Sequence, residues 1–86
     1  MKKRSFSFKE AREIGNTLGI DFSVIDVEQF RLGLGVELEH SGDEETDVTG
    51  GDELLTGKIA WAHLKEIPDY YTRLAKMELE AEQEKV

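Results

Sequence analysis

Cysteine is absent from this chain of 86 residues. The protein therefore has no disulfide bonds and no thiolate ligands, and any metal ion would be bound by carboxylate oxygens and imidazole nitrogens. Long apolar runs are also absent: no stretch approaches the length of a transmembrane helix, and the basic start of the chain is not followed by the apolar core of a signal peptide. These absences predict a cytoplasmic protein that does not enter a membrane.

Basic residues are fewer than acidic residues. The chain has 19 Asp and Glu residues against 11 Lys and Arg residues, which gives a net charge of -8. An acidic surface repels the phosphate backbone, so we expect no binding to nucleic acid. Basic residues collect near the start, where residues 1–6 are expected to form a flexible basic N-terminus. No Lys or Arg interrupts the acidic belt from Glu37 to Glu53.

The spacing of apolar residues predicts helices. They recur with helical periodicity in four segments, at about 8–18, 27–40, 52–66 and 68–82. A chain this short buries one modest core, so we expect a single all-α domain over residues 1–86, built as a compact bundle of four short helices. Acidic residues at the C-terminal end of the last helix meet the negative end of the helix macrodipole, and residues 81–86 are therefore expected to fray.

Residues that favour helix ends support these limits. Ser7 with Glu10 matches a capping box before the first helix, and Asp26 with Gln29 repeats that spacing before the second. Glycine inside a helix costs stability, so Gly33 and Gly35 in the second helix indicate either that another backbone packs closely there or that the helix is interrupted; we favour close packing.

The apolar positions of the last two helices are also readable from the sequence. The third helix is expected to supply the core through Leu55, Ile59, Ala60, Leu64 and Ile67. The apolar positions of the fourth helix are Tyr70, Tyr71, Leu74, Met77 and Ala81. Between the second and third helices, residues 41–51 are expected to form an acidic loop.

A calcium site is the sharpest hypothesis for this loop, because acidic residues alternate along it. A calcium-binding loop of the EF-hand type requires a glycine and a closing glutamate at fixed positions. Those positions are occupied here by Val48 and Leu54. We therefore interpret the loop as acidic but without a calcium-binding pattern.

Several motifs point to a known family. They are Leu18-Gly19-Ile20-Asp21, Val27-Glu28-Gln29-Phe30-Arg31, Glu37-Leu38-Glu39-His40, Thr56-Gly57-Lys58-Ile59-Ala60, Ala62-His63-Leu64 and Pro68-Asp69-Tyr70-Tyr71. On these motifs the chain resembles a family of small uncharacterised domains found in bacteria, archaea and phages. The resemblance extends from Phe6 to about Glu80. It implies no activity, but it implies that both histidine-bearing segments belong to the pattern that defines the family.

The two histidines raise the possibility of a metal site. Each has a glutamate three residues away: Glu37 precedes His40, and Glu66 follows His63. Residues three apart lie on one face of a helix, so two such pairs on facing helices would form a site of two His and two Glu ligands, which suits zinc or iron. Residues near enough in sequence to add or support a ligand are Glu39, Asp69 and Tyr70.

The same pairs also have a structural interpretation. In a chain with 19 acidic residues, a histidine often has an acidic neighbour at helical spacing by chance. His40 at a helix C-terminus is favoured by the helix dipole, and His63 with Glu66 can be a simple hydrogen-bonded pair. Metal binding and structural pairing both remain open.

A second functional hypothesis is a protein-interaction module without metal or catalysis, either an adaptor or an inhibitor of phage or mobile-element type. The acidic belt would occupy a basic groove on another protein. Its candidate contact residues are Asp43, Glu44, Glu45, Asp47 and Trp61. An enzyme is not expected, because the chain has no cysteine nucleophile and too few residues for an ordinary ligand cavity. Four short helices do not bury all of their apolar surface, which is compatible with a homo-oligomer.

Overall fold

The computed structural model describes residues 5–39, 45 and 50–84, and within these residues the chain forms four helices and no strand. The helices are α1 (Phe8–Leu18), α2 (Val27–Glu39), α3 (Glu53–Glu66) and α4 (Tyr70–Glu84). The predicted all-α fold is confirmed, and every described helix end lies within two residues of its predicted position. None of the helices in the described part of the chain is both long and apolar enough to cross a membrane.

Both ends of α1 follow from local chemistry. Ser7 Oγ accepts a hydrogen bond from the Glu10 N–H at 3.1 Å, and Glu10 Oε1 accepts one from the Ser7 N–H at 2.9 Å, which completes the predicted capping box. At the other end Gly19 has φ +85°, and its N–H bonds to the carbonyls of Gly15 and Asn16. A glycine adopts this left-handed conformation without the steric cost of a side chain.

The start of α2 differs from the prediction in one respect. Asp26 Oδ1 accepts a hydrogen bond from the Glu28 N–H at 2.8 Å, as an N-cap does. The Gln29 side chain does not complete a second capping box, because it bonds to α4 instead. The prediction that the Gln29 side chain completes a capping box was therefore wrong.

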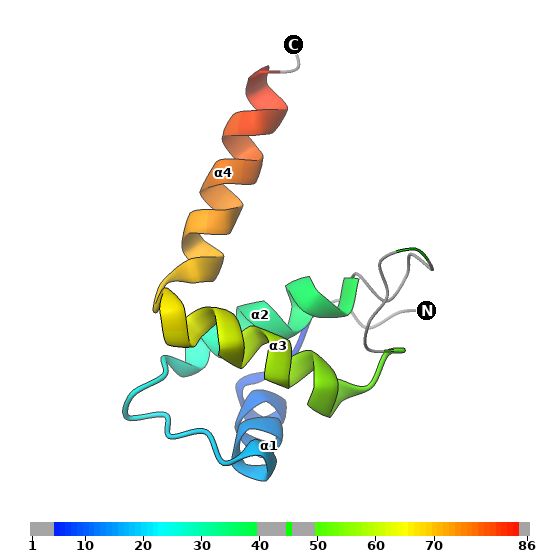
Figure 1. Ribbon diagram of the computed structural model, residues 1–86, viewed down its shortest axis with the longest axis vertical. Coiled ribbons are helices and arrows are strands. Elements are labelled where there is room, and N and C mark those ends of the chain that lie inside the picture. Colours follow the sequence, from blue (N-terminus) through cyan, green and yellow to red (C-terminus); the bar gives the residue numbers. More distant parts are fainter. Residues whose placement is uncertain (1–4, 40–44, 46–49, 85–86) are drawn as a thin grey trace.

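The core lies between α1, α2 and α3, with α2 in contact with all three other helices (Figure 1). From α2 it receives Phe30, Leu34 and Leu38, of which the first two have no exposed surface. The connection between α1 and α2 adds Ile20 and Ile25. The buried hydrophobic residues are Phe6, Ala11, Ile14, Ile20, Ile25, Phe30, Leu34, Leu38, Ala60, Leu64 and Tyr71.

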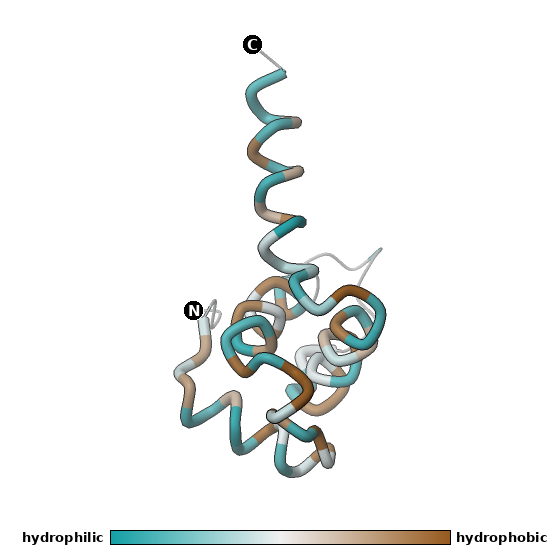
Figure 2. Tube along the Cα trace, turned by 90° about the vertical axis from the view of Figure 1, so that its left-hand side faces the viewer, coloured by the Kyte–Doolittle hydropathy of each residue, from teal (hydrophilic) through white to brown (hydrophobic). Residues whose placement is uncertain are grey.

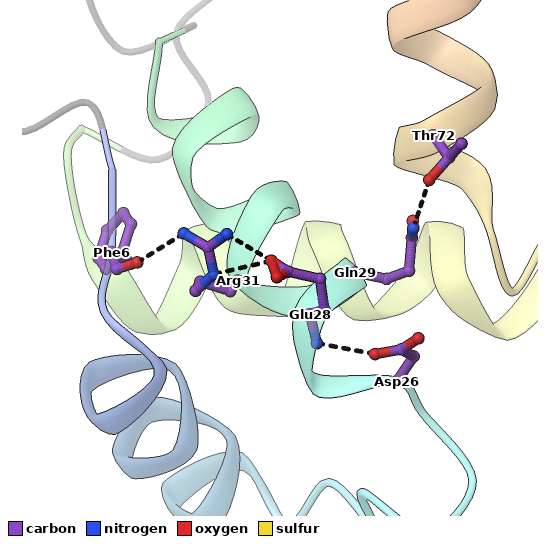
Figure 3. A network of polar contacts seen from close by, with 6 residues as sticks. All are labelled: Phe6, Asp26, Glu28, Gln29, Arg31 and Thr72. Carbon is purple, nitrogen blue, oxygen red and sulfur yellow. Dashed lines mark hydrogen bonds and ion pairs between the residues drawn. The ribbon is translucent and has the colours of Figure 1, made fainter.

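Phe6 corrects the expected extent of the flexible N-terminus. We placed residues 1–6 in that segment, but Phe6 is only 3% exposed and belongs to the core. Its carbonyl accepts a hydrogen bond from Arg31 Nη1 of α2 at 3.1 Å (Figure 3). The chain is therefore anchored from Phe6 onward, and residues 1–4 lie outside the described residues.

The buried face of α3 also differs from the prediction. Thr56, Ala60 and Leu64 are buried, whereas Leu55 and Ile67, which we expected in the core, are 43% and 39% exposed. The reason is the close approach of α1. A Cβ atom added at Gly57 would lie 2.9 Å from Leu18 Cδ1 and 3.0 Å from Ile14 Cγ2, so α1 packs closely against the side of α3 that carries Gly57.

α4 projects from the rest of the molecule (Figure 1). Tyr71 is the only buried residue in this helix of 15 residues. The Cα radius of gyration is 13.2 Å, and the longest dimension is 43 Å. A fully compact domain of this length would have a radius of gyration of about 12 Å. The projecting helix accounts for the difference.

Candidate functional site

A buried hydrogen bond joins α2 to α4. The Tyr71 hydroxyl donates to Glu37 Oε2 at 2.8 Å, and the two residues are 3% and 8% exposed. A buried carboxylate is costly unless it is hydrogen-bonded, and this donor compensates the cost in part. Burial, and then the adjacent Glu37, raise the pKa of Tyr71 far above its ordinary value. Burial thus favours the protonated phenol, which is the form that donates to Glu37.

His63 of α3 completes this junction. Its Nε2 atom lies 3.7 Å from Glu37 Oε2, and its ring stacks on Tyr70 with a centroid distance of 4.3 Å and planes 1° apart. The edge of the His63 ring also faces Tyr71, with centroids 6.2 Å apart. Side chains from three helices therefore meet around one carboxylate. We call Glu37, His63, Tyr70 and Tyr71 the junction cluster.

The structure combines the predicted metal ligands differently from the sequence pattern. It brings Glu37 of α2 to His63 of α3, whereas Glu66, the expected partner of His63 on the same helix, is exposed. His40 lies outside the described residues. Within the described ranges, no group of three or more His, Cys, Asp or Glu residues is placed to hold a metal ion.

The residues expected to support the ligands have different environments. The Tyr70 ring stacks on that of His63. Asp69 instead forms an ion pair with Arg73, in which Arg73 Nε donates to Asp69 Oδ1 at 2.7 Å, and Glu39 is exposed. The hydrogen bond from Arg73 lowers the pKa of Asp69 below its ordinary value.

Gln29 is a site residue that sequence reasoning missed. Its Oε1 atom accepts a hydrogen bond from the backbone N–H of Tyr71 at 3.0 Å, and its Nε2 atom donates to Thr72 Oγ1 at 2.6 Å (Figure 3). The first of these bonds satisfies the Tyr71 N–H, which lies in the first turn of α4, where backbone N–H groups have no partner within the helix. No signal in the sequence indicated this role, because Gln29 lies off the apolar stripe of α2 and its spacing from Asp26 indicated a capping box instead.

Gly33 shows how closely α4 approaches α2. A Cβ atom at this position would lie 2.4 Å from Cε2 of Tyr71 and 3.0 Å from Cβ of Ala60. Close packing at Gly33 is found, but the group that packs there is the Tyr71 side chain and not another backbone as predicted. The glycine thus creates the space in which Tyr71 reaches Glu37.

The predicted contact residues of the acidic belt fall mostly outside the described residues, namely Asp43, Glu44 and Asp47. Glu45 is described and exposed, and Trp61 is half-buried. Trp61 lines a shallow groove between α3 and the connection from α1 to α2, together with Val24 and Pro68. The Lys65 amino group lies 4.7 Å above the Trp61 ring, which is a cation–π contact.

A second apolar surface follows α4. A groove of about 270 Å³ is lined by Ile67, which precedes the helix, and by Tyr70, Arg73, Leu74 and Met77, which share one side of it. Met77 is 57% exposed. Hydrophobic segments recur along the projecting part of α4 between hydrophilic ones (Figure 2). We call Tyr70, Leu74 and Met77 the α4 stripe.

Comparison with known proteins identifies a family but no activity. A family model with the description "Protein of unknown function (DUF5661)" matches residues 11–80. No curated protein and no solved structure matches the chain. The matched region includes the junction cluster and α4 as far as residue 80, so part of the projecting helix lies within the family pattern.

Proposed function

We propose that the chain, which belongs to the DUF5661 family of proteins of unknown function, is a protein-interaction domain. From its geometry, we infer that it binds its partner through the α4 stripe. The observation that carries this proposal is the projection of α4, a helix with a single buried residue and an exposed apolar side. Apolar residues gathered on one exposed face mark interaction sites more often than single scattered ones do.

The stability of the helix itself supports the proposal. Isolated helices shorter than about 12–15 residues are marginally stable in water, because nucleation is costly and tertiary packing supplies most helical stability. Beyond Leu74, which is half-buried against the core, every described residue of α4 is exposed. A partner that covers the α4 stripe would supply the missing packing. The binding mode would be that of an amphipathic helix whose apolar side packs against an apolar surface of another protein.

A photo-crosslinking amino acid at position 77 tests this function in cells of the source organism. Met77 lies on the α4 stripe, and Ala75, also exposed, lies on another side of the same helix and is the matched control. We expect covalent protein adducts from position 77 and few from position 75. Adducts in equal yield from both positions, or from neither, would contradict the proposal.

The junction cluster supports a second candidate, metal binding at Glu37 and His63. The favouring observation is the 3.7 Å between Glu37 Oε2 and His63 Nε2, which brings one carboxylate and one imidazole from different helices together. Zinc and iron both use such ligands, and His40 and Glu66 remain the further ligands of this proposal. Elemental mass spectrometry of protein purified without chelator would detect near-stoichiometric metal that a His63→Ala variant loses. Metal contents below a tenth of the protein concentration in the wild type would reject this candidate.

A further inference from the structure

We propose that the partner of the α4 stripe is a second copy of this chain, bound with the two α4 helices antiparallel. This inference rests on the proposed function, because it names the occupant of the same surface. It follows from three features of α4: the spacing of its apolar residues, the distribution of its charges and its direction relative to the rest of the molecule.

The spacing matches that of a coiled-coil seam. Tyr70, Leu74, Met77 and Ala81 of α4 follow one another at intervals of four, three and four residues. Such intervals give the 3.5-residue repeat with which two helices pack side chains into each other's gaps. In the structure Tyr70, Leu74 and Met77 line one groove, so these seam residues lie on a single side of the helix.

The charges of α4 are segregated along its length. Its basic residues, Arg73 and Lys76, lie in the first half, and its described acidic residues, Glu78, Glu80, Glu82 and Glu84, lie in the second. In a parallel pair the two acidic halves would lie side by side. In an antiparallel pair each acidic half lies along the basic half of the other helix. Self-complementarity of this kind favours the antiparallel orientation.

The helix dipole favours the same orientation. Acidic residues at the C-terminal end of a helix are destabilising, because they meet the negative end of the macrodipole. An antiparallel second helix places its positive N-terminal end beside them. The glutamates that weaken the isolated α4 therefore become favourable in the pair.

A register follows from the seam. If Leu74 packs against Met77 of the second copy, Tyr70 packs against Ala81 and Arg73 faces Glu80 of the second copy. Arg73 already pairs with Asp69 through Nε. A guanidinium has five N–H donors, so it can bind a second carboxylate at the same time. Because the dimer is two-fold symmetric, the Arg73–Glu80 contact occurs twice.

The shape of the molecule permits this arrangement. The core lies at the N-terminal end of α4, and the helix leads away from it (Figure 1). Antiparallel pairing places the two cores at opposite ends of the helix pair, where they do not crowd each other. The seam covers only about two heptads, so we expect a weak dimer whose population rises with protein concentration.

Sedimentation velocity over a concentration series is the first test. The 9.8 kDa chain should shift toward twice this mass as concentration rises. Met77→Glu should remove the shift, whereas Ala75→Glu, which adds the same charge at an exposed position off the seam, should retain it. Circular dichroism would show that both variants fold. A wild-type chain that stays monomeric up to about 1 mM, or a Met77→Glu variant that still dimerises, would overturn the inference.

Charge reversal tests the register. Arg73→Glu and Glu80→Lys each turn the two symmetric attractions into repulsions and should weaken self-association about tenfold at low ionic strength. A mixture of the two variants should restore it, because each repelled chain then meets a complementary one. If the mixture associates no better than the single variants, these contacts do not exist.

Cysteine crosslinking tests the orientation, and the absence of native cysteine makes each introduced thiol unique. In an antiparallel pair, Leu74→Cys mixed with Met77→Cys should form disulfide-linked heterodimers. A parallel pair would instead crosslink Met77→Cys with itself, which would overturn the antiparallel orientation.

The photo-crosslinking experiment separates the two proposals. Adducts from position 77 with twice the mass of the chain support both. Adducts only with other proteins overturn self-association and leave the proposed function standing, whereas the absence of adducts rejects both.

Discussion

At the scale of single residues, the Tyr71 hydroxyl is the group on which the junction cluster depends. It is a buried donor to a buried carboxylate, 2.8 Å from Glu37 Oε2. Its raised pKa favours the protonated form, which is the form that donates to Glu37. Removal of such a donor leaves a charged group buried without one of its partners, which costs more than the net value of the hydrogen bond itself.

We therefore expect Tyr71→Phe to lower the free energy of unfolding by about 1–3 kcal/mol, measured by urea denaturation. Tyr70→Phe is the matched control, because Tyr70 contributes its ring to the stack with His63 and the structure shows no hydrogen bond from its hydroxyl to another described residue. The control should change stability by less than about 0.5 kcal/mol. Equal losses in the two variants would show that the hydroxyl of Tyr71 has no special role.

Gly33 supports the same contact by being small. Gly33→Ala should destabilise the protein by about 1–2 kcal/mol, since the clash of Cβ with the Tyr71 ring outweighs the gain of up to about 1 kcal/mol in helix propensity. Thermal or urea unfolding measures the loss. In a Tyr71→Ala background the same substitution should instead be neutral or stabilising, because the ring is gone. A Gly33→Ala protein as stable as the wild type would contradict the crowding at this position.

At the scale of elements, α4 is attached to α2 by its first turn. Gln29 bonds to the hydroxyl of Thr72 (Figure 3) and to the backbone of Tyr71, and Glu37 bonds to the Tyr71 side chain. Two polar side chains of α2 thus set where α4 starts and in which direction it leaves the core. Because the α4 stripe is presented by this attachment, the junction cluster and the proposed binding surface are physically linked.

Gln29→Ala should loosen this attachment. The substitution leaves the Tyr71 N–H without its acceptor, so we expect faster hydrogen exchange at the amides of Tyr71 and Thr72 and a loss of about 1–2 kcal/mol in the free energy of unfolding. Lys58→Ala, at an exposed position of α3, is the control and should leave that exchange unchanged. Unchanged exchange at Tyr71 in the Gln29 variant would mean that the first turn is held by other contacts.

At the scale of the whole molecule, the structure consists of a packed body and a projecting helix. The body contains α1, α2, α3 and the first turn of α4, and it includes all of the buried hydrophobic residues. The rest of α4 adds length without burial, which raises the radius of gyration to 13.2 Å. Stability and binding are therefore expected to reside in different parts of the chain.

A chain that ends after Leu74 tests this division. At low protein concentration, where any dimer is dissociated, its free energy of unfolding should lie within about 1 kcal/mol of the full-length value. The urea m-value should also be nearly unchanged, because little surface is buried by the deleted residues. A loss of more than about 3 kcal/mol would show that the distal part of α4 belongs to the cooperative core.

Much of the fold was predictable because its signals are local. Capping residues and apolar periodicity depend on neighbours within about four positions, so they placed the helices within two residues. Periodicity could not decide which apolar residues would be covered. Leu55, Ile67 and Met77 share the periodicity of buried residues but remain exposed, because the approach of α1 to Gly57 and the direction of α4 decide burial.

The candidate site, too, was only partly predictable from the sequence. The sequence by itself determined an acidic all-α protein without cysteine and selected Glu37 and His63 as residues of interest. Only the tertiary structure decided that these two residues meet across helices, that Tyr71 and Gln29 join them to α4, and that the stripe of α4 stays uncovered. The physical reason is that helix formation depends on neighbours along the chain, whereas pairing and burial depend on residues up to 43 positions apart that only packing brings together.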